Sequence, residues 1–299
     1  MLFIEYLVVR ALLLFLRCLP YRVALWLSRR AARLAFIFDS TPRTRAISHI
    51  QLAYAGTLAP GAAEQIALEA YESIAQHVVE AAHVRPQGKL GLHFENIEIL
   101  QNAYALGRGV VLVSAHMGCF VRMVLIPHMY GIRAAVIMKK QRNDRLLQWA
   151  IRHLKRHFDL DVIQKKEARD QIVEFLNDKK VVGLFADQHP RRGGFAARFF
   201  GLDVMAAGGP AVYAQRFQCP LVVLTATVRA DGRHVLRLDG PLPIEGTAEE
   251  VSQRWLDVLE ARIREHPGQW TWMHRRWRGP EIEARLALSS PAAGVSRED

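Results

Sequence analysis

Cysteine is scarce in this sequence. The chain of 299 residues contains three cysteines, Cys18, Cys119 and Cys219, far apart from one another. An odd number of widely separated cysteines excludes a disulfide framework and lacks the spacing of a zinc site. The sequence therefore indicates a reducing compartment, and we expect neither a bound metal nor an organic cofactor.

The sequence also lacks an apolar run typical of a membrane-spanning helix. Its most apolar stretch, Leu2 to Leu16, is interrupted by Glu5 and Arg10. A spanning helix needs about 20 mostly apolar residues, and a charge near its centre costs a few kcal/mol. A second stretch, Val23 to Ile37, carries three arginines among its apolar residues.

Three interpretations of residues 1–38 remain open. The two stretches are typical of helices that lie in a membrane interface, with apolar side chains toward the acyl chains and arginines toward the headgroups. The alternatives are a single-pass helix and a buried pair of amphipathic helices. We do not expect a cleaved signal peptide, because no small-residue cleavage site follows and Glu5 stands where basic residues belong.

Acidic residues are too few to balance the basic ones. The chain has 40 Lys and Arg against 29 Asp and Glu, a formal net charge of +11. Such a surface attracts nucleic acid, an acidic protein or anionic lipid headgroups. We expect no nucleic-acid partner, because the chain has no recognisable basic recognition helix or aromatic RNA-binding platform.

The body of the chain alternates short β-branched runs with amphipathic helical patterns. This alternation predicts one α/β domain, residues 39–284, built as an α/β sandwich around a largely parallel mixed sheet. The small, polar residues of 285–299 predict a disordered tail. The expected strands are Gly109–Ala115, Ala134–Met138, Val181–Ala186, Pro220–Val228 and His234–Leu238; the expected helices include Asp144–Phe158, Ala168–Asn177, Gly209–Gln218 and Ala248–Glu265.

Two titratable residues directly follow predicted strands. His116 comes after GVVLVSA and Asp187 after VVGLFA, and turn-forming glycines follow each of them. In open α/β sheets, ligands bind at the carboxyl ends of the strands. A histidine at such an end can act as a general base toward a hydroxyl, although an isolated histidine is more often a hydrogen-bonded core residue.

Three sequence motifs carry a resemblance to a known family. Ser114 to Phe120 reads SAHMGCF, Ala186 to Gly201 contains ADQ followed by FFG, and Gln269 to Trp277 reads QWTWMHRRW. Together they resemble the lysophospholipid acyltransferase superfamily, and within it the late acyltransferases of lipid A biosynthesis. The three motifs stand in the order and with the spacing of that family.

The resemblance implies the transfer of a fatty acyl group. The donor would be an acyl thioester on acyl carrier protein or coenzyme A. The acceptor would be a hydroxyl or amine of a membrane lipid, such as a lipid A precursor or another glycolipid or phospholipid. The protein would act at the cytoplasmic face of a bacterial inner membrane. The implied catalytic residues are His116 and Asp187, and the implied substrate-binding residues are Gly118, Arg156, Arg275 and Arg276.

One position departs from the family pattern. The family has an acid five residues after its histidine, in the motif H-x4-(D/E), but this chain has Val121 there and no Asp or Glu between Glu98 and Asp144. Loss of an orienting carboxylate can reduce turnover by roughly four orders of magnitude. Four explanations remain open: a distant carboxylate such as Asp187, a slow enzyme, a lipid-binding homologue without catalysis, and Cys119 as an acyl-accepting nucleophile.

Overall fold

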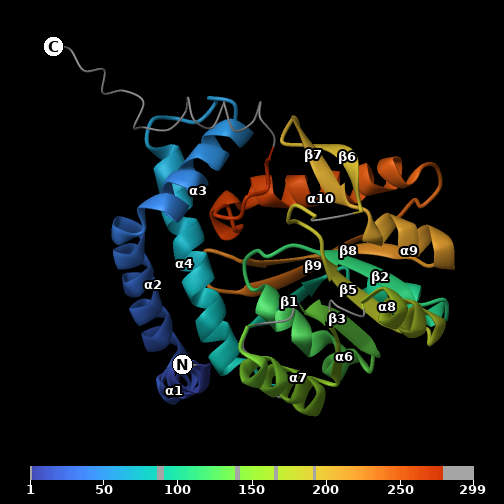
Figure 1. Cartoon of the computed structure of the whole chain (residues 1–299), viewed down its shortest axis with the longest axis horizontal. Helices are drawn as coiled ribbons and strands as arrows, with labels where there is room; N and C mark the ends of the chain where they lie inside the picture. Colours follow the sequence, from blue (N-terminus) through green and yellow to red (C-terminus); the bar gives the residue numbers. More distant parts are fainter. Residues whose placement is uncertain (1, 86–90, 139–141, 165–167, 191–192, 279–299) are drawn as a thin grey trace.

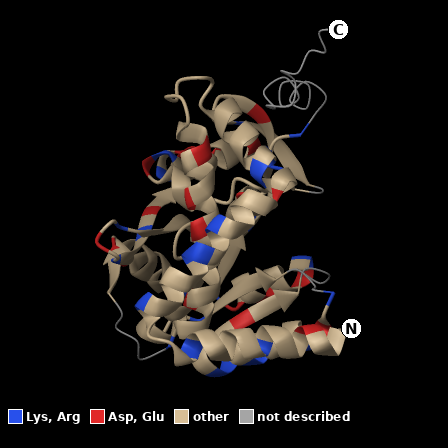
Figure 2. Cartoon of the chain, turned by 90° about the vertical axis from the view of Figure 1, so that its left-hand side faces the viewer, with Lys and Arg blue, Asp and Glu red and all other residues tan. Residues whose placement is uncertain are grey.

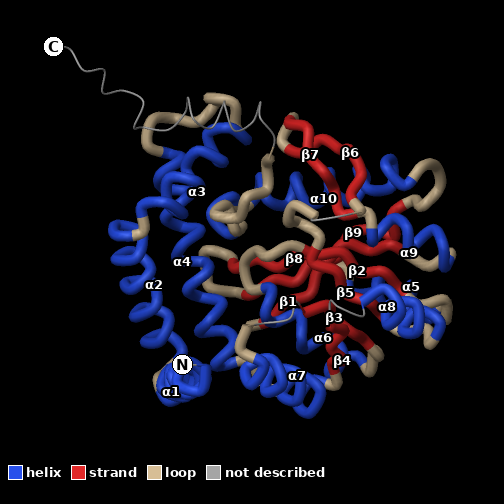
Figure 3. Tube along the Cα trace, in the orientation of Figure 1, coloured by secondary structure: helices blue, strands red, loops and turns tan. Residues whose placement is uncertain are grey.

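The computed structural model describes residues 2–85, 91–138, 142–164, 168–190 and 193–278 (Figure 1). The expected disordered tail, residues 285–299, lies outside the described residues. Helices and strands alternate along most of the chain after residue 91. The described part forms an α/β fold, with a central sheet and helices on both of its faces (Figure 3).

The sheet has seven strands in the order β1-β9-β8-β2-β5-β3-β4. Its neighbouring strands are parallel in every pair except β8 and β9, which are antiparallel. The predicted sandwich around a largely parallel mixed sheet is therefore confirmed. The strands of this sheet are β1 (Leu92–Glu95), β2 (Val110–Ser114), β3 (Ala134–Met138), β4 (Leu160–Gln164), β5 (Val181–Phe185), β8 (Leu221–Val228) and β9 (His234–Leu242).

Side chains along each central strand alternate between two hydrophobic cores, because successive residues of a strand point to opposite faces. In β2, Val111 and Val113 belong to one core and Val110 and Leu112 to the other. The first core includes side chains of α8 (Ala168–Asn177), α9 (Gly209–Phe217) and α10 (Ala248–Glu265). The second includes α5 (Ile97–Ala105), α6 (Leu125–Tyr130), α7 (Asp144–Phe158) and the short 3-10 helix η1 (Phe120–Val124).

The expected elements are present with small shifts at their ends, but four strands were not expected. These are β1, β4 and the separate antiparallel hairpin of β6 (Gly194–Phe199) and β7 (Leu202–Ala207). β1 and β4 lie at the two edges of the sheet. Edge strands are short and bear polar side chains, so their apolar pattern is weak.

Four helices at the start of the chain pack together beside the sheet (Figure 1). α1 (Leu2–Cys18), α2 (Tyr21–Phe38) and α3 (Ser40–Ala53) all contact α4 (Ala62–His83). Within the described residues, no helix combines the length and the apolarity needed to cross a membrane. α1 and α2 nevertheless keep many large apolar side chains on the surface: Leu2, Phe3, Ile4, Leu7, Val8, Leu12, Leu14, Phe15, Val23, Trp26, Leu27, Leu34, Ile37 and Phe38.

Candidate active site

His116 and Asp187 meet because their strands are neighbours. β2 and β5 pair in parallel, with Ser114 opposite Phe185. Each candidate residue lies two positions beyond one of these partners, at the carboxyl edge of the sheet. The parallel register therefore brings two residues that are 71 positions apart in the sequence into contact.

The Asp187 carboxylate accepts three hydrogen bonds. The imidazole Nδ1 of His116 lies 2.9 Å from Oδ1. The backbone N–H of His116 donates to Oδ2 at 3.0 Å, and the indole N–H of Trp270 donates to the same oxygen at 3.0 Å. With Nδ1 donating to the carboxylate, the other ring nitrogen, Nε2, carries the free lone pair of the neutral imidazole.

The contact between His116 and Asp187 shifts the pKa values of both groups in the direction of an ion pair, against the effect of burial. The Asp187 side chain is 2% exposed and that of His116 is 31% exposed. Burial acts to raise the pKa of Asp187, but the charge and hydrogen bonds of His116 and the bond from Trp270 hold it below its usual value. Burial acts to lower the pKa of His116, but the carboxylate outweighs it, so the pKa of His116 is raised. Asp187 thus strengthens His116 as a base.

The C-terminal motif holds the loop that carries His116. Thr271 donates from its hydroxyl to the carbonyl of His116 at 2.9 Å. The N–H of Gly118 donates to the carbonyl of Gln269 at 2.9 Å. Gly118 has φ +53°, and a Cβ there would lie 2.3 Å from the carbonyl oxygen of Ala226 in β8. Only glycine fits this close approach, so the role of Gly118 in the geometry is to pack the loop against β8.

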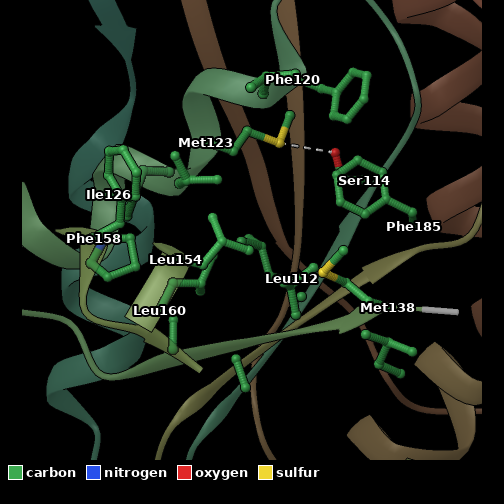
Figure 4. Close-up of a pocket in the computed structure, with 18 of the residues that line it drawn as sticks. Leu112, Ser114, Phe120, Met123, Ile126, Met138, Leu154, Phe158, Leu160 and Phe185 are labelled. Carbon is green, nitrogen blue, oxygen red and sulfur yellow. Dashed lines mark hydrogen bonds between the residues drawn. The ribbon is translucent and has the colours of Figure 1, made fainter. Parts of the chain in front are cut away.

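An apolar cavity of about 540 Å³ opens beside His116 (Figure 4). The rings of Phe120 and Phe185 lie against the imidazole, with centroids 5.4 and 4.7 Å from its own. Aliphatic side chains from β2, β3, β5 and α7 form much of the wall. A cavity of this size and character suits a hydrocarbon chain, with its reacting end next to the histidine.

Val121, at the position of the missing acid, lies in the wall of this cavity. It belongs to η1, directly after Phe120. An acidic side chain at this position would therefore stand among apolar groups. The carboxylate that bonds to His116 is that of Asp187, just after β5, in agreement with the first of the four explanations.

The candidate substrate-binding arginines lie outside the cavity. Arg156 is exposed on α7, and Arg275 is exposed in the C-terminal motif. Arg276 is 1% exposed: it donates from Nη1 to the carbonyl of Met205 at 2.8 Å, and its guanidinium lies over the ring of Phe199. Among the described residues that line the cavity, none is an arginine and Gly118 is not included.

Sequence reasoning missed the contact of Trp270 with Asp187. Trp270, Trp272 and Trp277 of the C-terminal motif are all buried. Trp270 is also a hydrogen-bond donor to the candidate catalytic carboxylate. The repeated Trp of QWTWMHRRW was the available signal, but nothing in it says which ring reaches the site.

Cys119 does not have the environment of a nucleophile. Its side chain is fully buried and its thiol donates to the carbonyl of Thr227 at 3.2 Å. Burial, with the nearby charge of Glu80, raises the pKa of this thiol to about 12. A nucleophilic cysteine needs an accessible thiolate, so the structure argues against this explanation.

Comparison with known families gives a match over most of the chain. The sequence model for bacterial lipid A biosynthesis acyltransferases matches residues 2–279. The matched region extends from α1 through the C-terminal motif and contains both His116 and Asp187. A search of curated proteins found no matching relative.

Proposed function

Because the chain belongs to the bacterial lipid A biosynthesis acyltransferase family, we propose that it transfers a fatty acyl group from an acyl thioester to a membrane lipid. The acceptor group is a hydroxyl or amine, as in a lipid A precursor or another glycolipid or phospholipid. The observation that carries this proposal is the bond between His116 and Asp187 at the edge of an apolar cavity. A base, its orienting acid and a hydrocarbon site are three features that acyl transfer uses.

In the proposed reaction, His116 acts as general base and then as general acid. Its Nε2 takes the proton of the acceptor group, whose oxygen or nitrogen attacks the thioester carbonyl. Asp187 stabilises the imidazolium that forms. The tetrahedral intermediate then collapses, the carbon–sulfur bond breaks, and the thiolate takes the proton from Nε2. The products are the acylated lipid and a free thiol, and the protein returns to its starting state.

The apolar cavity would supply most of the binding energy for the donor's acyl chain. Removing a CH₂ group from water contributes about 0.8 kcal/mol. The cavity wall includes Leu112, Leu154, Phe158 and Leu160, which offer no competing polar group (Figure 4). Because the chain would lie with its thioester end at His116, the bound geometry would also orient the carbonyl for attack.

Arginines outside the cavity are proposed to hold the phosphate groups of the substrates. Arg275 and Arg278 are exposed on the segment that follows Trp270 and Thr271, both of which contact the candidate dyad. Arg156 is exposed on α7, whose apolar side lines the cavity. Arginine forms bidentate bonds with phosphate, and acyl carrier protein, coenzyme A and phosphorylated lipids all present anionic groups.

The exposed apolar side chains of α1 and α2 are proposed to enter the membrane interface. Trp26 on α2 is 57% exposed and Phe38, at its end, is 83% exposed. Figure 2 shows basic residues on this side of the molecule, separated by long uncharged stretches. Apolar side chains flanked by arginines suit a surface of anionic headgroups. We propose the cytoplasmic face of the bacterial inner membrane as the location.

The proposal is tested by supplying purified protein with acyl-coenzyme A or acyl carrier protein and an acceptor lipid extract. Thiol release and acylated lipid, identified by mass spectrometry, are measured together. We expect transfer by the wild type and its loss in His116→Ala. His128→Ala is a matched control, because His128 also contacts an aspartate, Asp159, but lies exposed on α6.

Two results would contradict the proposal. One is His116→Ala retaining wild-type transfer. The other is a wild-type protein that binds fatty acids but neither transfers them nor hydrolyses a thioester with any donor. The second result would favour the alternative function, a non-catalytic lipid-binding member of the same family.

A further inference from the structure

A buried carboxylate on α4 joins four elements of the fold. Glu80 is 0% exposed, and its Oε2 lies 2.5 Å from Nε of Arg122, which is 1% exposed and belongs to η1. Its Oε1 accepts from the hydroxyl of Tyr21 on α2 at 2.5 Å, and lies 2.7 Å from Nε2 of His234 on β9. Gln76 donates to the same oxygen from one helical turn away. These five residues are called the Glu80 cluster below.

The Glu80 cluster carries a charge in the interior of the protein. Burial acts to raise the pKa of Glu80, but the contacts with His234, Arg122 and Tyr21 lower it to about 2. Glu80 is thus a carboxylate, and Arg122 is its cationic partner. A buried ion pair is commonly no more stabilising than apolar side chains of the same size. The effect of the Glu80–Arg122 ion pair is therefore to be found in how it positions the elements that it joins.

One of these elements is η1, the segment just after the His116 loop. Four of its five residues, Phe120, Val121, Met123 and Val124, line the apolar cavity. The fifth, Arg122, lines instead a separate polar cavity of about 840 Å³ between α2, α4 and the turn from β8 to β9. The ion pair therefore holds η1 from the side opposite the apolar cavity.

We propose that Glu80 and Arg122 are positioning residues that set the wall of the apolar cavity and, through it, which acyl chain lengths are accepted. This inference rests on the proposed acyl transfer. Neither residue lines the apolar cavity, so both act through Phe120 and Val121. Without the ion pair, η1 keeps its apolar contacts but loses the charge contact that holds Arg122 in place, and the cavity wall relaxes.

The test compares Glu80→Gln with the wild type over a series of acyl donors of increasing chain length. We expect the ratio of kcat/KM between the best and the poorest donor to fall by roughly tenfold, the order of discrimination that an apolar pocket gives. Asp239→Asn is the matched control: Asp239 on β9 also pairs with arginines, Arg262 of α10 and Arg237 of β9, and neither of these belongs to η1. The control should lower the melting temperature at most and leave the ratio unchanged.

The ratio of kcat/KM between donors distinguishes a positioning role from a role in stability. Loss of folded protein lowers the rate with every donor by the same factor and leaves this ratio unchanged. Glu80→Gln combined with Arg122→Met removes both buried charges, and supplies a folded protein if the single variant is too unstable. We expect the ratio to stay low in this double variant. An unchanged ratio in Glu80→Gln, or in the double variant if only that one folds, would overturn the proposal.

A second readout is independent of catalysis. Saturated fatty acids of increasing length are used to displace cis-parinaric acid from the apolar cavity, in wild type and variants. If the wild type transfers no acyl group, the proposed function fails, but this displacement profile still tests the Glu80 cluster. A profile that is flat in the wild type, or the same in wild type and variants, would overturn the inference.

Discussion

Replacing Asp187 by asparagine tests the central feature of the site with a minimal change in shape. The carboxylate accepts N–H groups on both oxygens: His116 Nδ1 on Oδ1, and the backbone of His116 and Trp270 on Oδ2. An asparagine has one oxygen to accept with. If that oxygen keeps the two bonds at the Oδ2 position, the NH₂ group faces Nδ1 of His116. The imidazole must then accept at Nδ1 and carry its proton on Nε2.

A proton on Nε2 blocks the base. In serine proteases the equivalent change of tautomer reduces kcat by about 10⁴, which corresponds to about 5 kcal/mol of transition-state stabilisation. We expect a loss of that order in Asp187→Asn. The fold should persist, because two of the three hydrogen bonds remain and a buried charge is removed. Asp203→Asn is a surface control, since Asp203 is 94% exposed on β7.

The assay is initial-rate acyl transfer as a function of pH, with circular dichroism to verify the fold. The base is active when His116 is neutral, so the wild-type rate falls as pH falls through a pKa raised above the usual 6.5. In Asp187→Asn the carboxylate no longer raises the pKa of His116. The fall of the remaining rate at acid pH should therefore occur at a lower pH than in the wild type. An Asp187→Asn protein that keeps a rate within tenfold of the wild type, with the same fall at acid pH, would refute the reasoning.

Three further predictions concern the loop, the cavity wall and the membrane surface. Gly118→Ala should lower the free energy of unfolding, measured by denaturant titration, by at least 1–3 kcal/mol, roughly the cost of a forced backbone shift. Gly131→Ala, also at positive φ but with open space around its Cβ, should lower that free energy by less. Val121→Glu should lower activity and cost several kcal/mol unless the new carboxyl is protonated; a gain of transfer would show that the acid was merely lost. Trp26→Glu should weaken co-sedimentation with anionic lipid vesicles without affecting the melting temperature, whereas Met129→Glu, on α6, should not; equal binding by both variants would count against α2 as the docking surface.

The sequence by itself determined the fold class and pointed to His116 and Asp187 as candidate site residues. The β-branched runs are continuously apolar because their strands lie inside the sheet with both faces covered. Their alternation with helical patterns therefore identified β2, β3, β5 and β8. His116 and Asp187 stood out because each follows one of these runs, and their catalytic role was implied by the family resemblance. Three motifs in order along the chain identified the family, which the match over residues 2–279 confirms.

Only the tertiary structure decided which groups act on one another. Strand order is set by packing over long distances in the sequence, so no local pattern says that β2 and β5 are neighbours or that Asp187 stands beside His116. The same holds for Trp270, which reaches the carboxylate from 83 residues away, and for Glu80, whose partners come from three other elements. Arg276, predicted as a substrate contact from its motif, is buried against Met205 and Phe199. The chemistry of each side chain follows from the sequence, but the distances between the side chains are set only when the strands pair and the two cores form on the faces of the sheet.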